Sequence, residues 1–259
     1  MQTEPGTVGR VIAVLERLAH SHKPMRLTEI ARGLQLPVSS THVLLRSLTS
    51  LGYVEVNTDD RTYSVGPRMV RLSIGIVSRL EVVDVGRPLV TDLAMRLGED
   101  VYLAVAERDA ISYAYKADGE QSLRLDIQLG IERPLHATSV GKLYLAMQND
   151  NDLERLLGTL NLYAFTSSTA VELRTLRKQI EEIRSLGYAV SDQEMVEGIV
   201  ASAAPIFDDR GRMIGAVSAP VLRTKFKERG GELVEALSET AAQISERLGW
   251  VSSEMPASR

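Results

Sequence analysis

The sequence predicts an α+β protein that begins with a winged helix-turn-helix and continues into a domain with an antiparallel sheet. Three observations predict this class. Residues 27–53 hold a short helix, a sharp turn and a second helix, and two alternating segments that form a hairpin follow them. The remaining chain mixes helical periodicity with short alternating strands that succeed one another, which is typical of antiparallel pairing.

The helix-turn-helix is indicated by its start and stop signals. Thr28 is the predicted N-cap of the first helix, and Gly33, Gln35 and Pro37 break that helix. Pro37 suits the start of the second helix, because its missing N–H costs nothing there. Apolar residues then recur at helical spacing, at Val38, Leu44, Leu45, Leu48 and Leu51. A preceding amphipathic helix over residues 8–19 is expected to pack beneath both.

Short polar side chains crowd the first turns of the second helix, where helix-turn-helix proteins contact base edges in the major groove. The alternating segments 53–56 and 62–65 predict a wing whose Arg61 neutralises a phosphate. An alternative is a protein-docking module with a solvated polar edge. The predicted DNA-binding residues are Thr28, Ser39, Ser40, Thr41, His42, Arg46 and Arg61.

Turn-forming residues and the periodicity of apolar residues divide the chain into four parts. Residues 1–65 form the winged helix-turn-helix, 66–86 a connecting helix, 87–250 a second domain and 251–259 a tail. The connecting helix is more apolar than a solvated linker needs, so it either pairs with another subunit or docks on its own domain.

The second domain is predicted to be α+β. A helix over 89–97 follows Arg87-Pro88, and further helices are expected over 139–147, 152–157, 173–186 and 233–248. The predicted strands are 101–106, 111–115, 123–127, 200–207 and 213–221, with a hairpin turn between the last two.

Composition and charge restrict the class further. The chain has 259 residues and no Cys, so disulfides and Cys-ligated zinc are excluded. Residues 1–80 carry a net charge of +4 and the rest carry −8, which places the basic excess with the expected DNA reader. No signal peptide is visible and no apolar run approaches the ~20 residues of a membrane span, which predicts a cytoplasmic protein without a membrane partner.

Four stretches resemble the IclR family of bacterial transcription regulators. They are LTEIARGLQLPVSSTHVLLRSLTSLGYV, RTYSVGPRMVRL, PLHATSVGKLYLA and GYAVSDQEMVEGIVASAAPIFDDRGRMIGAVSAP. The resemblance implies a GAF-like effector-binding domain and a homodimer or tetramer. One departure concerns Val38 and Val43, which stand where family members often have basic residues.

A ligand site is expected at residues 136–142. Thr138 or Ser139 would cap the following helix, and free N–H groups from Ser139 through Val140 to Gly141 would face a small anion such as a carboxylate. The resemblance implies that a later segment lines the same cavity, and Tyr102, Tyr113 and Tyr115 are candidate walls. The residues carried over from the family are Ser191, Asp192, Glu194, Ala201 and Ser202.

These features predict a ligand-responsive regulator that binds double-stranded operator DNA and controls a catabolic operon. Enzyme chemistry is not expected. The residue types of a hydrolase triad are present at His136, Ser139 and Asp192, but the sequence has no G-x-S-x-G motif to support that chemistry. It also has no Walker motif, dinucleotide-binding motif or His cluster, so no cofactor or metal is predicted. The alternatives are a hydrolase-like domain fused to a DNA anchor, and an architectural DNA-binding protein without an effector.

Overall fold

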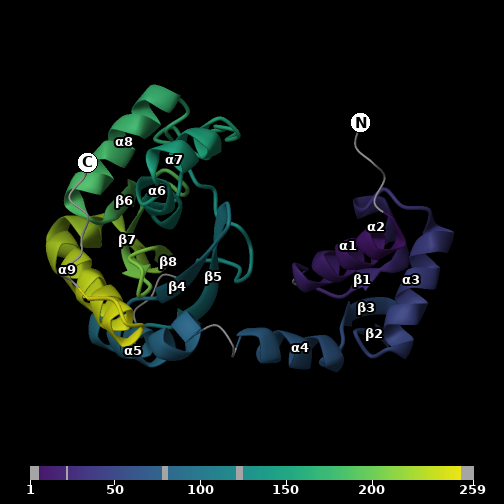
Figure 1. The fold of residues 1–259 in the computed structure, drawn as a ribbon. Helices are drawn as coiled ribbons and strands as arrows, with labels where there is room; N and C mark the ends of the chain where they lie inside the picture. Colours follow the sequence, from purple (N-terminus) through teal and green to yellow (C-terminus); the bar gives the residue numbers. More distant parts are fainter. Residues whose placement is uncertain (1–5, 22, 78–80, 121–124, 252–259) are drawn as a thin grey trace. The chain divides into compact units, whose positions relative to one another are not determined.

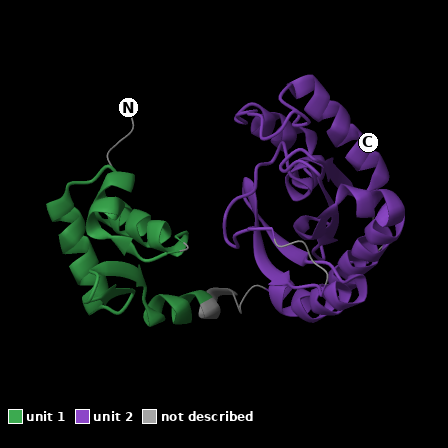
Figure 2. Cartoon of the chain, turned by 180° about the vertical axis from the view of Figure 1, so that it is seen from behind, with its two compact units in different colours: residues 1–79 green, residues 80–259 purple. Residues whose placement is uncertain are grey.

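The computed structural model describes residues 6–21, 23–77, 81–120 and 125–251. The chain divides into two compact units, residues 1–79 and residues 80–259 (Figure 2). The predicted connecting segment, 66–86, spans the boundary, and its residues 78–80 lie outside the described ranges, as do residues 252–259 of the predicted tail.

In the first unit, α1, α2 and α3 surround one small core (Figure 1). α1 spans Thr7–Ala19, α2 spans Leu27–Gly33 and α3 spans Val38–Ser50. Gln35 closes the turn between α2 and α3 with a left-handed φ of 54°. The buried apolar side chains that hold the unit together come from these helices and the following strand, at Val14, Leu18, Ile30, Leu45, Leu48 and Val54.

A three-stranded antiparallel sheet completes this unit. β2 (Val54–Asn57) and β3 (Thr62–Val65) form the predicted wing hairpin, and β1 (Met25–Arg26) pairs with the other edge of β3. α4 (Pro67–Val77) follows and contacts β2. Gly66 is required before α4, because a Cβ there would lie 2.5 Å from the carbonyl oxygen of Gly52.

One feature of α2 corrects the expectation. α2 begins at Leu27 with Arg26 as its N-cap, so Thr28 is an exposed residue of the first turn and not the cap. The carboxylate of Glu29 accepts the Arg26 N–H at 2.6 Å, so the third residue of the helix satisfies the backbone donor of the N-cap.

The second unit is built on a five-stranded antiparallel sheet of order β5-β4-β8-β7-β6 (Figure 1). The strand bounds are Val101–Glu107 for β4, Ala110–Ala117 for β5, Ala189–Asp192 for β6, Ile199–Phe207 for β7 and Met213–Leu222 for β8. β6 was not predicted, because only four residues of it alternate. The predicted strand at 123–127 is wrong for residues 125–127, which form no strand.

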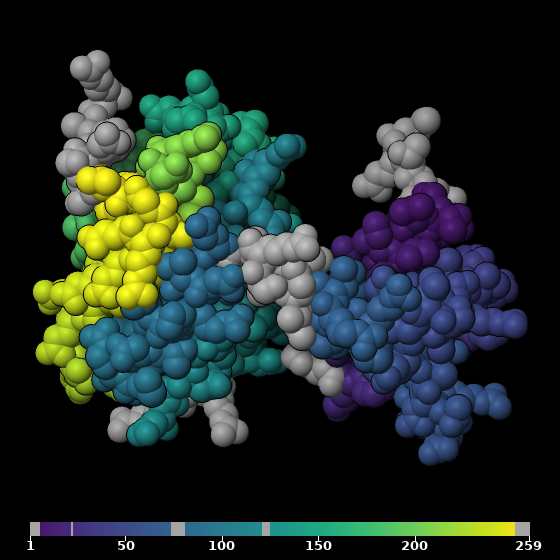
Figure 3. All heavy atoms as spheres, turned by 60° about the horizontal axis from the view of Figure 1, so that its bottom comes forward, coloured from purple at the N-terminus to yellow at the C-terminus, as the bar shows by residue number. Residues whose placement is uncertain are grey.

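Helices cover both faces of this sheet. α5 (Glu81–Leu97) and α9 (Arg223–Arg247) pack on one face and contact each other, and Figure 3 shows them as adjoining blue and yellow surfaces. α6 (Ser139–Ala146) packs on β5, β6, β7 and β8 from the opposite face, with α7 (Asp150–Leu157) and α8 (Leu173–Leu186) outside it.

Two helices begin earlier than predicted. α5 contains Pro88 in its interior, and buried Val82, Val83 and Gly86 anchor the turns before it. Tertiary packing therefore overrides the proline signal that placed the helix start at residues 87–89. α9 begins at Arg223 and bends at Arg229, where the backbone leaves helical geometry, so its first segment lacks the continuous periodicity of residues 233–248.

Candidate functional site

α3 presents two different faces, and only one of them is accessible. Thr41, Leu45 and Leu48 point into the core, whereas Ser39, His42 and Arg46 are exposed. Val43 is exposed as well, at 62% of its surface. The exposed residues lie at helical spacing near the N-terminal half of α3, which is the part that enters the major groove in helix-turn-helix complexes.

One of the predicted hydroxyls on α3 is not on that face, and another is only partly accessible. Thr41 is fully buried and its hydroxyl donates to the Pro37 carbonyl at 3.0 Å. Ser40 is half-buried. Thr41 therefore secures the first turn of the helix, and we leave it out of the proposed DNA interface.

The wing tip is polar and tightly hydrogen-bonded. The Asp60 carboxylate accepts the backbone N–H of Thr62 at 3.1 Å and its hydroxyl at 2.7 Å, and these bonds hold the pKa of Asp60 below its usual value. Arg61 is exposed with a left-handed φ of 55°. The tip thus presents one cation beside the acidic Asp59 and Asp60, so its attraction for phosphate is smaller than the sequence position of Arg61 alone suggested.

The second unit encloses a cavity of about 210 Å³ between the start of α6, the 193–198 turn and strands β5 to β8. Thr138 and Ser139 belong to the lining, as do Ser191 of β6 and Ala201 of β7, which pair with each other. The rest of the lining is mainly apolar, with Tyr113, Leu125, Asp126, Ile127, Arg133, Met195, Val196, Ile199 and Pro220.

The start of α6 is fixed by close packing. The Thr138 hydroxyl donates to the Pro134 carbonyl at 2.9 Å and accepts the Gly141 N–H at 3.0 Å. Gly141 permits this turn, because a Cβ there would lie 2.6 Å from the Pro134 carbonyl oxygen. The N–H groups of Ser139 and Val140 come before the first intrahelical bond. Ser139 lines the cavity, whereas Val140 lies in the apolar core and Gly141 donates its N–H to Thr138, so neither of these two predicted residues belongs to the lining.

Strand alternation decides which predicted effector residues reach the cavity. Ser191 and Ala201 face it, whereas Asp192 and Ser202 lie on the face covered by α9. Asp192 pairs there with Arg223 at 3.0 Å. Ser202 is buried, and its hydroxyl has no hydrogen-bond partner among the described residues.

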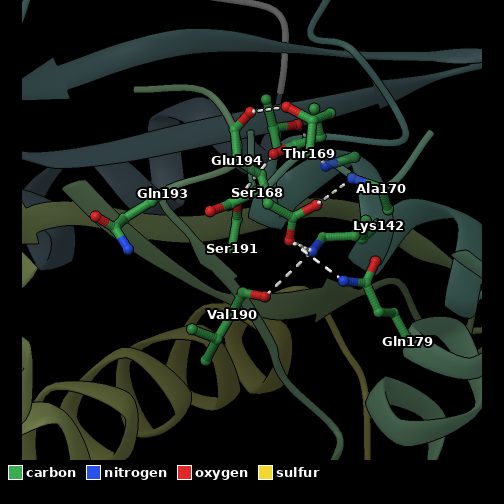
Figure 4. A network of polar contacts seen from close by, with 12 residues as sticks. Lys142, Ser168, Thr169, Ala170, Gln179, Val190, Ser191, Gln193 and Glu194 are labelled. Atoms are coloured by element: carbon green, nitrogen blue, oxygen red, sulfur yellow. Dashed lines mark hydrogen bonds and ion pairs between the residues drawn. The ribbon is translucent and has the colours of Figure 1, made fainter. Parts of the chain in front are cut away.

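Glu194 has a different partner from the one expected. Its carboxylate forms a buried ion pair with Lys142 of α6, and Figure 4 shows the Lys142 ammonium between this carboxylate and the Val190 carbonyl. The Glu194 carbonyl accepts the Thr169 hydroxyl at 2.6 Å. Burial lowers the pKa of Lys142, although the charge of Glu194 opposes this effect. The pair joins α6 to the turn that carries Met195 and Val196.

Each of the three residues considered as a hydrolase triad has a different partner. His136 Nε2 lies 2.9 Å from the Tyr163 carbonyl, the Ser139 hydroxyl lies 3.4 Å from that of Ser218, and Asp192 is engaged by Arg223. Within the described ranges no cluster of His, Asp and Glu is arranged to hold a metal ion. The same ranges contain no helix with the length and apolar character that a bilayer crossing needs.

Comparison with protein families decides the identity. Residues 7–58 match the IclR helix-turn-helix domain, and residues 74–246 match the C-terminal domain of the bacterial transcriptional regulator IclR. The chain belongs to the IclR family. It is therefore a transcription regulator with a DNA-binding helix-turn-helix domain and not an enzyme, which confirms the predicted family, the α+β class and the DNA partner.

Individual relatives agree with this assignment. The HTH-type transcriptional regulator BhcR of Paracoccus denitrificans strain Pd 1222 is 31% identical over 238 residues, which is 91% of this IclR-family chain and 85% of BhcR. The crystal structure of IclR from Thermotoga maritima is 28% identical, with a TM-score of 0.77 over 94% of this chain and 99% of that one. An IclR homologue from Microbacterium hydrocarbonoxydans, complexed with 4-hydroxybenzoate, shares the fold with a TM-score of 0.83 at 23% identity, over 94% and 99% of the two chains.

Sequence reasoning missed most of the cavity wall. Tyr113 was a candidate and lines the cavity, but Tyr102 and Tyr115 do not belong to the lining. Arg133, Met195 and Ile199 were not singled out, although Arg133 stands directly before the Pro134-Leu135-His136 motif. A cation next to a predicted anion site was the available signal.

Proposed function

We propose that this IclR-family regulator senses a small carboxylate in the cavity at the start of α6. The observation that carries the proposal is that Ser139, the first residue of α6, lines a largely apolar cavity, where the N–H at the start of a helix can bind an anion. The lining fits a ligand with an apolar body and one polar end. The complex of the Microbacterium homologue with 4-hydroxybenzoate gives a precedent for a carboxylate in a protein of this fold.

The DNA interface we propose is the exposed face of α3 with the wing. Ser39, His42, Arg46 and Arg61 are exposed. Ser39 and His42 would contact base edges, and Arg46 and Arg61 would contact phosphates. Thr28, exposed in the first turn of α2, is placed to contact the backbone. The protein would act in the cytoplasm as a homodimer or as a tetramer made of two dimers. Its operator would be palindromic, because a protein with two-fold symmetry binds a DNA site with the same symmetry. The regulated genes would be a catabolic operon that supplies or consumes the carboxylate.

A thermal-unfolding screen against small aliphatic, aromatic and sugar-derived acids tests the sensor function. An acid at a hundredfold excess over its dissociation constant should add about 2.7 kcal/mol to the free energy of unfolding. Ser139→Ala should reduce this gain, and Ser168→Ala, which truncates an exposed serine outside the cavity lining, should leave it unchanged.

DNA footprinting tests the operator function. We expect protection of two related half-sites about one helical turn apart. Protection of a single asymmetric half-site would contradict the dimer, and the absence of any ligand-dependent stabilisation in the screen would contradict the sensor.

A further inference from the structure

A cation lies in the wall of the same cavity. Arg133 belongs to the segment that leads into α6, and its backbone N–H donates to the Ile111 carbonyl of β5 at 2.8 Å. The neighbouring residue, Glu132, forms an isolated bridge with Ser112. The backbone that carries Arg133 is thereby fixed to the sheet, so its side chain starts from a defined position at the cavity.

The guanidinium of Arg133 lies near an aromatic ring, and its Nε lacks an acceptor among the described residues. Its Cζ lies 5.4 Å from the ring centroid of Tyr113, a side chain that is only 4% exposed. The Nε atom is buried and has no hydrogen-bond partner among the described residues. None of the ion pairs between described residues includes Arg133.

Arg133 as a whole is half-buried, but its Nε donor is buried, and a buried donor without an acceptor is unfavourable because it has lost water without gaining a partner. The other acids that sequence reasoning placed near this site are already used elsewhere, Asp192 by Arg223 and Glu194 by Lys142. The walls of the cavity are largely apolar, with Leu125, Ile127, Met195, Val196, Ile199 and Pro220. The lining also contains Asp126, which has an interaction of its own. The missing acceptor is therefore best supplied by a ligand.

We infer that Arg133 is the specificity-determining residue of the cavity, pairing with the carboxylate of the effector and selecting acids over neutral molecules of the same shape. This inference rests on the proposed sensor function and adds a named charge partner to it. A guanidinium binds a carboxylate through two parallel N–H···O bonds, which an uncharged amide cannot reproduce. The cavity volume of about 210 Å³ limits the acid to a small one.

The test compares each acid with its own primary amide. Isothermal titration of the full-length protein is carried out with benzoate, isovalerate and pyruvate, and with benzamide, isovaleramide and pyruvamide. We expect the protein to bind at least one acid about tenfold more tightly than its amide. Arg133→Met should abolish this preference, and Arg133→Lys should keep part of it, because a point charge remains without the fork.

Arg210→Met provides the matched control. It removes the same charge from an exposed position in the turn between β7 and β8, so the preference for the acid should be unchanged. Circular dichroism and operator binding without ligand show whether each variant is folded.

The outcomes separate the two claims. If Arg133→Met still prefers the acid over the amide, the role of Arg133 is overturned and the sensor function stands. Equal binding of acid and amide by the unchanged protein would likewise overturn the role of Arg133 and leave the sensor function standing. If the unchanged protein binds none of the six molecules, carboxylate sensing fails and the inference fails with it.

Discussion

At the scale of single residues, the recognition helix separates side chains of similar chemistry into different roles. Ser39 and Thr41 both carry hydroxyls within the first turn, but Ser39 is exposed and Thr41 is fully buried. The same period of 3.6 that puts Leu45 and Leu48 into the core also puts Thr41 there. Residue type alone therefore did not distinguish a base contact from a structural hydroxyl.

This difference gives a pair of opposite expectations. His42→Ala removes an exposed donor and acceptor, so the affinity for the specific operator should fall by about 1–3 kcal/mol while nonspecific binding changes little. Thr41→Ala removes the buried bond to Pro37, so the free energy of unfolding should fall by about 1 kcal/mol without loss of specific affinity below the unfolding transition. Fluorescence anisotropy with both DNAs and urea denaturation measure these quantities.

Two results would contradict the assignment. A loss of specific affinity in Thr41→Ala equal to that in His42→Ala would place Thr41 in the interface. Equal losses on specific and nonspecific DNA in His42→Ala would make His42 a backbone contact.

At the scale of elements, the sequence identified those that carry a clear period. Helices α1 to α3 and the wing were predicted, as were β4, β5, β7, β8 and the helices α6 to α8. β6 was missed because a strand of four residues shows too little alternation of apolar and polar residues. Residues 125–127 do alternate, but they pair with no strand. Both failures concern pairing, which is decided by tertiary contacts.

A β-bulge explains why the tyrosines of β5 were misassigned. Simple alternation puts Tyr113 and Tyr115 on one face of the sheet, but the pairing with β4 shifts at Leu103 and Ala104 and leaves Ala114 unpaired. Tyr113 therefore faces the cavity, whereas the Tyr115 hydroxyl lies 2.8 Å from that of Thr91 in α5. The sequence contains no local signal for this bulge.

The turn between β7 and β8 depends on one carboxylate, and this gives a pH-dependent expectation. Burial raises the pKa of Asp208, but hydrogen bonds from the backbone N–H and guanidinium of Arg212 and the N–H of Arg210 outweigh it, so the net pKa is lowered. A lowered pKa stabilises the fold above the unfolded value of about 4, and this stabilisation is lost as pH falls through the folded pKa.

Asp208→Asn should thus lower the free energy of unfolding by about 1 kcal/mol at pH 7. The difference from the unchanged protein should shrink as the pH falls below about 4. Urea denaturation over a pH series measures it, with Asp209→Asn, an exposed neighbour, as the control. A difference that stays constant down to the lowest pH would exclude the ionised Asp208 as its cause.

The ion pair between Lys142 and Glu194 links α6 to the turn that forms part of the cavity wall. Lys142→Met would leave Glu194 buried without its partner, so the free energy of unfolding should fall by about 3–5 kcal/mol. The double variant Lys142→Met/Glu194→Met removes both charges and should recover most of this loss. Chemical denaturation of the single and double variants measures the coupling.

The control for this cycle is Arg155→Met, which breaks an exposed pair with Asp109 and should cost little. A double variant as unstable as Lys142→Met would show that the loss comes from packing and not from the uncompensated carboxylate.

At the scale of the whole molecule, the distribution of charge along the sequence distinguished the DNA-binding unit from the unit with the cavity. The basic excess of residues 1–80 coincides with the unit that carries α3, and the acidic excess with the unit that carries the cavity. The sequence predicted which unit meets DNA, because electrostatics over many residues does not depend on exact side-chain positions. It did not predict Arg133, because a single cation facing an apolar cavity depends on where a loop meets the sheet.

A regulator of this design requires that operator and effector binding affect each other. If the acid changes the operator affinity by a given factor, the operator must change the affinity for the acid by the same factor. Anisotropy titrations with and without the best-bound acid, and calorimetry of that acid with and without operator DNA, measure the two factors. We expect equal values of about 5–150-fold.

Two variants identify where this coupling comes from. Arg133→Met should remove the effect of the acid in both directions while operator affinity without ligand stays unchanged, because Arg133 lies in the second unit. Arg46→Gln should weaken operator binding and reduce the salt dependence by about one counterion, but leave the affinity of the free protein for the acid unchanged. If the two factors differ, the acid also acts on another equilibrium, such as subunit assembly. Sedimentation at the same protein concentrations would then show an acid-dependent change in oligomeric state.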